Sequence, residues 1–173
     1  MYALVYYLAG EIEQINQLRR KYDPQVDLIA PHITLVFPLP ESIGETYLIS
    51  HIENILCQQK PFPLHLHGLQ KSWDDYLFLL LQEGKEEVIH LHHQLYTGVL
   101  AKYHKQEIEY LPHVTLGVFT ENKNKYAQAY QEAEDLKLDL RCLLDRLHLV
   151  KLNDEWSKIV WSKEFLLPKE QYD

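Results

Sequence analysis

The sequence has only two cysteines and no long apolar run. Cys57 and Cys142 lie far apart and form no Cys-x-x-Cys pair, so neither a cysteine-based zinc site nor a disulfide framework is predicted. No segment reaches the roughly eighteen consecutive apolar residues of a membrane-spanning helix. The apolar start Met1–Leu8 lacks a basic leader and soon reaches Glu11 and Glu13, which does not fit a signal peptide. We therefore expect a cytoplasmic protein with no membrane partner.

Positive charge is also scarce. The chain has 17 lysines and arginines against 25 aspartates and glutamates, which gives a net charge of −8. Long nucleic acids are bound mainly through neutralised phosphates, and this usually requires a basic surface. An acidic chain therefore suits a small phosphodiester or the end of an RNA better than a long nucleic acid. Glycines and prolines number only six and eight, so flexible linkers and low-complexity tails are not predicted.

One short motif occurs twice in this chain. The segments Pro31–Phe37 and Pro112–Val118 both begin with proline, histidine, a β-branched aliphatic residue, threonine and leucine, and they start 81 residues apart. A single His-x-Thr on a strand is most often an ordinary half-buried pair. Core packing constrains apolar volume but not the identity of a polar pair. The repetition of the same histidine and threonine therefore indicates a functional requirement.

Both copies of the motif have the composition of a β-strand, and the leading proline favours an extended start. Because successive strand side chains point to opposite faces, His32 and Thr34 share one face, and His113 and Thr115 do so in the second copy. An imidazole exchanges a proton near neutral pH, and a hydroxyl can hydrogen-bond an anionic oxygen. Two such pairs across a cleft could hold a phosphate between two proton-transfer groups.

The two motifs resemble those of the 2H phosphoesterases, a family named for two His-h-(Thr/Ser)-h motifs in which h is hydrophobic. Here the motifs are His32–Leu35 and His113–Leu116, and both match without substitution. The family includes the bacterial proteins called 2′-5′ RNA ligases and several cyclic nucleotide phosphodiesterases. The spacing and the order of elements fit over nearly the whole chain, so the resemblance covers a domain.

The resemblance implies an α+β fold with two pseudo-symmetric lobes. Each lobe would be an antiparallel sheet with helices on its outer face, and the cleft between the lobes would hold both motifs. Within a single domain of residues 1–173, we expect one lobe at about 1–82 and the other at about 83–173, with an exchange of the termini left open. The residue pattern alone does not exclude parallel wiring, because a helix precedes each motif strand.

The resemblance also implies metal-independent hydrolysis of a cyclic phosphodiester, such as a 2′,3′-cyclic nucleotide or an RNA end. His32 and His113 would be the catalytic acid and base, in an order that a nearly symmetric pair does not reveal. Thr34 and Thr115 would bind the phosphate. No metal or other cofactor is expected, and the protein is expected to be a monomer. Neither motif strand contains a lysine or arginine, so a cation for the phosphate would have to come from elsewhere.

Three other functions remain open from the sequence. The first is 2′-5′ RNA ligase activity, which is the reverse of the hydrolytic direction. The second is a catalytically idle module that binds a nucleotide or an RNA end. The third is a metal-dependent hydrolase built on the surplus histidines, of which the chain has ten in all.

The remaining histidines and basic residues favour surface roles. His65 and His67 share one face of a predicted strand without a carboxylate or cysteine nearby in sequence, which favours an exposed or cleft-lining face over a metal site. His90 and His93 lie three apart on a predicted helix, and a polar helix face explains them better than a ligand pair. The basic run Arg19–Lys21 ends a helix and is expected to be solvated.

Periodicity and turn residues predict alternating strands and helices. The strands are expected at 2–8, 31–37, 62–68, 76–81, 111–119, 137–143, 146–152 and 158–165. The helices are expected at 11–22, 41–57, 83–103 and from a cap at 120–122 to about 135.

Overall fold

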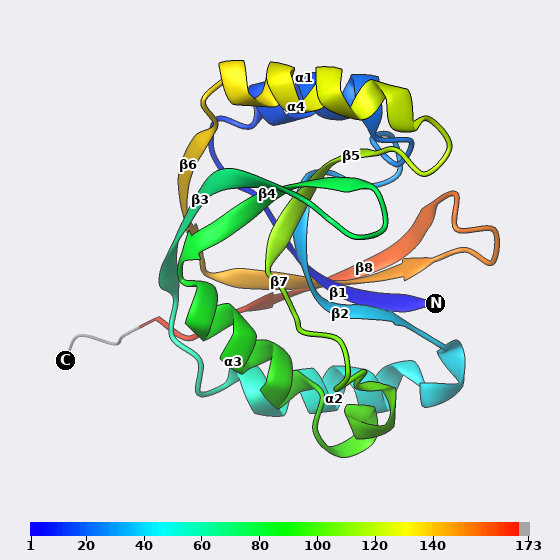
Figure 1. The fold of residues 1–173 in the computed structure, drawn as a ribbon. Helices are drawn as coiled ribbons and strands as arrows, with labels where there is room; N and C mark the ends of the chain where they lie inside the picture. Colours follow the sequence, from blue (N-terminus) through cyan, green and yellow to red (C-terminus); the bar gives the residue numbers. More distant parts are fainter. Residues whose placement is uncertain (170–173) are drawn as a thin grey trace.

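The structure, a computed structural model, describes residues 1–169 (Figure 1). Its strands are β1 (Tyr2–Tyr7), β2 (His32–Leu39), β3 (Phe62–Lys71), β4 (Tyr76–Glu83), β5 (His113–Val118), β6 (Asp139–Leu144), β7 (Arg146–Leu152) and β8 (Ile159–Leu166). Its α-helices are α1 (Glu13–Tyr22), α2 (Glu45–Leu56), α3 (Lys85–Leu95) and α4 (Tyr126–Asp135). Short 3₁₀ turns are η1 (Glu41–Ile43), η2 (Gly98–Tyr103) and η3 (Lys123–Lys125).

The strands form two four-stranded sheets. The first sheet has the order β2-β1-β7-β8, and the second has the order β5-β4-β3-β6. Every neighbouring pair is antiparallel. The α+β fold with two antiparallel sheets and flanking helices is therefore confirmed, and the parallel alternative is excluded for the described strands.

The two sheets do not follow the expected division of the chain at about residue 82. Strands β3 and β4 join β5 and β6 in the second sheet, and the chain then returns to place β7 and β8 in the first. The reason lies in β1, which is buried along nearly its whole length and needs a neighbour on each side. Strand β7 supplies the second neighbour. The last four residues of the expected second lobe, 170–173, lie outside the described residues.

The helices form two outer pairs (Figure 1). Helix α1 follows β1 of the first sheet but packs on β5 of the second, where α4 lies beside it. Helix α3 follows β4 of the second sheet but packs on β2 of the first, beside α2. The helix that follows a strand of one sheet thus packs on the motif strand of the other sheet. Both motif strands, β2 and β5, are supported by a helix in this way.

Apolar side chains pack on both faces of β1, a central strand of the first sheet. On β1, Leu4 and Tyr6 belong to the main core, which is continuous with the second sheet and the helices. Ala3 and Val5 alternate with them and pack with Ile29 in a smaller cluster on the other face. The segment between α1 and β2 therefore covers part of the face on which the first motif histidine lies.

The predicted helix at 83–103 is shorter than expected. Helix α3 ends at Leu95, and the 3₁₀ turn η2 follows from Gly98. Gly98 has φ +52°, in the left-handed region that favours glycine and ends helices. The Thr97 hydroxyl donates to the Gln94 carbonyl at 2.7 Å, which also competes with helix continuation. None of the described helices is long and apolar enough to cross a membrane.

Candidate active site

The two motif histidines lie at equivalent places in the two sheets. His32 is the first residue of β2 and His113 is the first residue of β5, and these are edge strands of their sheets. The two edge strands contact each other. The fold therefore brings together two copies of the motif that are far apart in the sequence.

The predicted alternation of faces holds in both copies. Ile33 and Val114 are almost fully buried, whereas the histidine and threonine on either side of each are half-buried. From the proline to the sixth residue, the two copies have the same order of buried and half-buried positions. The histidine and threonine of each motif thus remain accessible, although the residues between and directly after them are buried.

The repeated proline explains how each strand begins. The carbonyl of Pro31 accepts a hydrogen bond from the Leu8 backbone N–H at 3.0 Å, and the carbonyl of Pro112 accepts one from Leu81 N–H at 3.2 Å. In both sheets this bond joins the motif strand to the end of its antiparallel neighbour. Proline lacks an N–H and is tolerated at such a strand start, so the same residue performs the same structural task twice.

Both imidazoles are held by a backbone carbonyl two residues upstream. Nδ1 of His32 lies 2.9 Å from the Ala30 oxygen, and Nδ1 of His113 lies 2.6 Å from the Leu111 oxygen. Because a carbonyl oxygen only accepts hydrogen bonds, Nδ1 carries the proton in both rings. In the neutral form Nε2 then has the free lone pair, and this nitrogen can take up or release a proton.

Burial makes both motif histidines weak bases. It lowers the pKa of His32 to about 4, against the smaller raising effect of the Ala30 hydrogen bond. Arg19 and His113 lower that pKa further, and Asp23 raises it. Burial also lowers the pKa of His113, while the hydrogen bond to its upstream carbonyl and the charge of Asp74 raise it. Both rings are therefore neutral at pH 7, and the two lie within electrostatic reach of each other.

Aromatic rings flank the two histidines. Phe78 of β4 stacks on His113 with a centroid distance of 3.6 Å and an interplanar angle of 24°. Tyr7 of β1 meets His32 edge-on at 6.4 Å and also contacts His148 at 5.0 Å. These rings reduce the rotational freedom of the imidazoles and supply flat apolar surface beside them.

Arg19 corrects one prediction, because it is not part of a solvated helix end. Its side chain is buried, with Nε 2.8 Å from an Asp23 carboxylate oxygen and Nη2 2.8 Å from the Ile29 carbonyl. Its Nη1 is buried without a hydrogen-bond partner among the described residues. Arg19 thus fixes the segment that leads into His32. The i,i+4 spacing of Arg19 and Asp23 was a sequence signal for this pair, whereas Arg20 and Lys21 are exposed as expected.

His65 and His67 lie apart from the motif strands. They are on β3, which β4 separates from β5, and their rings stack at 5.8 Å. His65 Nε2 lies 2.9 Å from an Asp139 carboxylate oxygen on β6. A carboxylate therefore does accompany these histidines, and sequence analysis missed it because it lies 74 positions away from His65.

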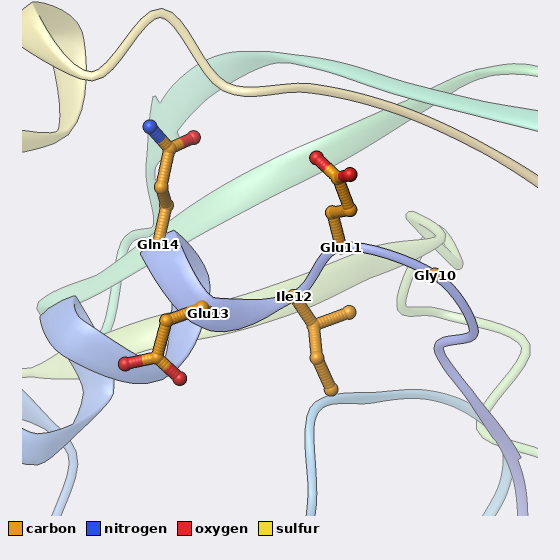
Figure 2. Close-up of a pocket in the computed structure, with 5 residues that line it drawn as sticks. All are labelled: Gly10, Glu11, Ile12, Glu13 and Gln14. Atoms are coloured by element: carbon orange, nitrogen blue, oxygen red, sulfur yellow. The ribbon is translucent and has the colours of Figure 1, made fainter.

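A surface hollow at the β1–α1 turn does not coincide with the motif site. It is lined by the five residues Gly10–Gln14 (Figure 2). Two of these, Glu11 and Glu13, are acidic, and neither motif histidine lines the hollow. Two carboxylates repel an anionic phosphate, so the paired motifs are the better candidate for a phosphate site.

Comparison with known proteins establishes the family. The model described as "2'-5' RNA ligase superfamily" matches residues 8–156, a stretch that includes both motifs. The chain belongs to this superfamily. The resemblance to the 2H phosphoesterases is therefore confirmed.

Relatives in the superfamily carry matching names. A protein of Geobacillus thermodenitrificans named "Putative phosphoesterase" is 28% identical over 137 residues, 78% of each chain. A relative of the same kind from Geobacillus sp. strain WCH70 is 28% identical over 160 residues, 90% of each chain. The family and these names indicate an enzyme that acts on phosphate esters.

Two solved structures have the same fold as this chain. The crystal structure of E. coli LigT complexed with 3'-AMP matches with a TM-score of 0.59 and 17% identity, over 96% of this chain and 94% of LigT. The protein TT0787 of Thermus thermophilus matches with a TM-score of 0.61 and 15% identity, over 96% and 94% of the two chains. At such low identity these matches show the fold alone.

Proposed function

We propose that this superfamily member is a metal-independent phosphoesterase that hydrolyses a cyclic phosphodiester by paired-histidine acid–base catalysis. The observation that carries the proposal is the matched setting of His32 and His113. Each begins an edge strand, has a threonine two residues later and donates Nδ1–H to the carbonyl two residues earlier. Two equivalent proton-transfer groups on contacting strands suit a reaction that needs one base and one acid.

In the proposed reaction, one neutral histidine accepts a proton from water at Nε2 while the water oxygen attacks phosphorus. The other histidine, protonated when the anionic substrate binds, donates its proton to the departing ribose oxygen. The bond from phosphorus to that oxygen breaks, and the product is a phosphate monoester. Thr34 and Thr115 donate hydrogen bonds to non-bridging oxygens, whose negative charge increases in the transition state.

The proposed substrate is a 2′,3′-cyclic nucleotide or an RNA end that carries such a phosphate. The net charge of −8 supports a small substrate, because a long nucleic acid would be repelled. The complex of LigT with 3'-AMP supports a nucleotide ligand in this fold. Phe78 beside His113 and Tyr7 beside His32 offer rings on which a base can stack. The proposed enzyme works as a monomer and requires no cofactor.

The decisive experiment is a panel of 2′,3′-cyclic nucleotides and a short RNA ending in a cyclic phosphate. His32→Ala and His113→Ala are each expected to lower kcat by about 10² to 10⁴, with unchanged circular dichroism. His90→Ala is the matched control, because His90 is exposed on α3 and belongs to neither motif. Near-full activity in either motif variant would contradict the proposal.

The same panel separates the alternatives. Nucleotide binding without turnover by the wild type would identify a binding module. Joining of a cyclic-phosphate RNA end to a 5′-hydroxyl RNA would identify ligation as the direction of catalysis. Activity that disappears in a chelator while the protein stays folded, and returns with a metal, would identify a metal-dependent hydrolase.

A further inference from the structure

Three histidines outside the motif site converge behind the motif strands. His92 and His93 are on α3, and His104 follows the η2 turn. One ring nitrogen of each lies within 4.8 Å of those of the other two. The sequence pattern suggested a polar helix face with His90 beside His93, but the structure instead places His93 with His92 and His104. We propose that these three histidines form a binding site for a divalent transition-metal ion, with zinc as the best fit.

His92 has the environment of a preorganised metal ligand. Its ring is buried and stacks on Tyr110 with a centroid distance of 3.7 Å and an interplanar angle of 5°. Its Nδ1 donates to the carbonyl of Leu35 at 2.8 Å, which leaves the lone pair on Nε2. Metal-bound histidines almost always donate their second nitrogen to such an acceptor, because this bond fixes the tautomer and the ring.

The other two rings complete the cluster from more open positions. His104 is half-buried and stacks on Tyr96 at 5.0 Å and 19°, whereas His93 is exposed. In a tetrahedral site with Zn–N bonds of about 2.0–2.1 Å, neighbouring nitrogens are roughly 3.4 Å apart. Binding of an ion would therefore require the less confined rings of His93 and His104 to rotate toward His92. Three histidine ligands leave a fourth position for water or another small ligand.

The cluster is linked to both motif strands. His92 bonds the carbonyl of Leu35 in the first motif, and its stacking partner Tyr110 precedes the second motif by three positions. The Tyr110 hydroxyl also donates to the Thr34 carbonyl at 2.8 Å. A bound ion would therefore tie the α3–β5 connection to β2, and it would stabilise the folded protein by mass action.

The test is zinc binding by the full chain, measured with a competing chromophoric chelator and with cobalt as a spectroscopic substitute. We expect one equivalent of zinc and a visible cobalt spectrum typical of tetrahedral coordination. His93→Ala and His104→Ala are each expected to weaken binding by on the order of tenfold or more. His90→Ala, earlier on the same helix, is expected to bind like the wild type.

The test uses substitutions at exposed His93 and half-buried His104, because a change at buried His92 could also affect folding. Equal zinc affinity for the wild type, His93→Ala and His104→Ala would overturn the proposal, as would the absence of stoichiometric binding. Loss of binding in His65→Ala instead would assign the ion to His65 and His67 of β3 with Asp139 of β6, and this too would overturn the proposal. None of these measurements depends on phosphoesterase activity.

Discussion

The two motif histidines are neutral at pH 7, so both are in the form that accepts a proton and neither is in the form that donates one. Each has Nδ1–H bonded to a carbonyl and a pKa lowered mainly by burial. The catalytic acid must nevertheless be protonated when the leaving oxygen departs. An anion between the rings favours the charged imidazole, so in the proposed mechanism the substrate itself would bring about protonation of the acid.

This coupling predicts proton uptake on anion binding. Sulfate keeps its two negative charges across the neutral pH range, so protons taken up when it binds go to the protein. Because the bound state holds more protons, sulfate affinity is expected to rise as the pH falls. Calorimetry in buffers of different ionisation enthalpy measures the uptake directly. His32→Gln and His113→Gln should each reduce it, and pH-independent binding without uptake would refute the coupling.

The buried pair of Arg19 and Asp23 predicts a large effect on stability. Both side chains are almost fully buried, so Arg19→Met would leave the Asp23 carboxylate buried without its cation. Removing one partner of a buried pair typically costs about 3–5 kcal/mol. Urea unfolding measures this loss. The double variant Arg19→Met/Asp23→Asn should recover part of it.

A matched control stands next to Arg19 in the sequence. Arg20→Met removes an exposed arginine that pairs with Glu13 on the surface. Its cost is expected to stay within about 0.5 kcal/mol. Similar costs for Arg19→Met and Arg20→Met would show that the buried pair does not anchor the segment before β2.

At the scale of elements, the sequence predicted the features that depend on the local pattern of apolar and polar residues. The alternation of buried and half-buried side chains on β2 and β5 follows from the period of two in a strand. The positions of most helices and strands likewise follow from side-chain periodicity. Burial of Arg19 and the approach of Asp139 to His65 depend on contacts between distant segments, so periodicity could not show them. The same holds for the cluster of His92, His93 and His104, whose members meet only because η2 folds the chain back.

The second motif strand departs from the repeat at Gly117, where the first copy has Val36. A β-carbon added at Gly117 would lie 2.8 Å from the Tyr22 β-carbon and 2.8 Å from the Phe119 ring. The end of α1 therefore approaches β5 too closely for any other residue. Gly117→Ala is expected to destabilise the protein by about 1–3 kcal/mol through overpacking.

Urea unfolding checks the Gly117→Ala prediction. Leu143→Ala is a suitable control, because Leu143 is a half-exposed strand residue of the same sheet. Its cost should be clearly smaller. Unchanged stability in Gly117→Ala would mean that α1 and β5 can move apart without cost. It would contradict the conclusion that close packing of α1 on β5 requires glycine at this position.

In the molecule as a whole, two sheets share one core. Helix α1, which follows a strand of the first sheet, packs on the second sheet, and helix α3, which follows a strand of the second, packs on the first. The sequence predicted two antiparallel sheets through the family resemblance, but the division near residue 82 did not anticipate that β3 and β4 join the second sheet. Pairing between strands far apart in the chain decides this arrangement. Composition and period carry no information about which apolar strand becomes the second neighbour of β1.

The whole molecule is also expected to lose stability in acid. Burial lowers the pKa values of His32 and His92 to about 4 from an ordinary value of 6.5. The unfolded chain therefore takes up protons first as the pH falls. The contribution of these histidines is complete above about pH 6.5 and is lost progressively down to about pH 4.

Urea unfolding across this pH range measures the acid effect. The free energy of unfolding should fall between about pH 6.5 and about pH 4.5, and His92→Gln should show a shallower fall than the wild type. His90→Ala is the control and should keep the wild-type slope. A stability that is constant over this range would contradict the lowered pKa values of these two rings.

The order of strands also has a consequence for synthesis. All four strands of the second sheet lie between Phe62 and Leu144, so this sheet can assemble as soon as that stretch has left the ribosome. The first sheet stays incomplete until β7 and β8, which follow later in the chain, have also emerged. A nascent chain truncated before β7 would leave the backbone groups along one edge of β1 without their partner strand, and such an unpaired edge can pair with another chain.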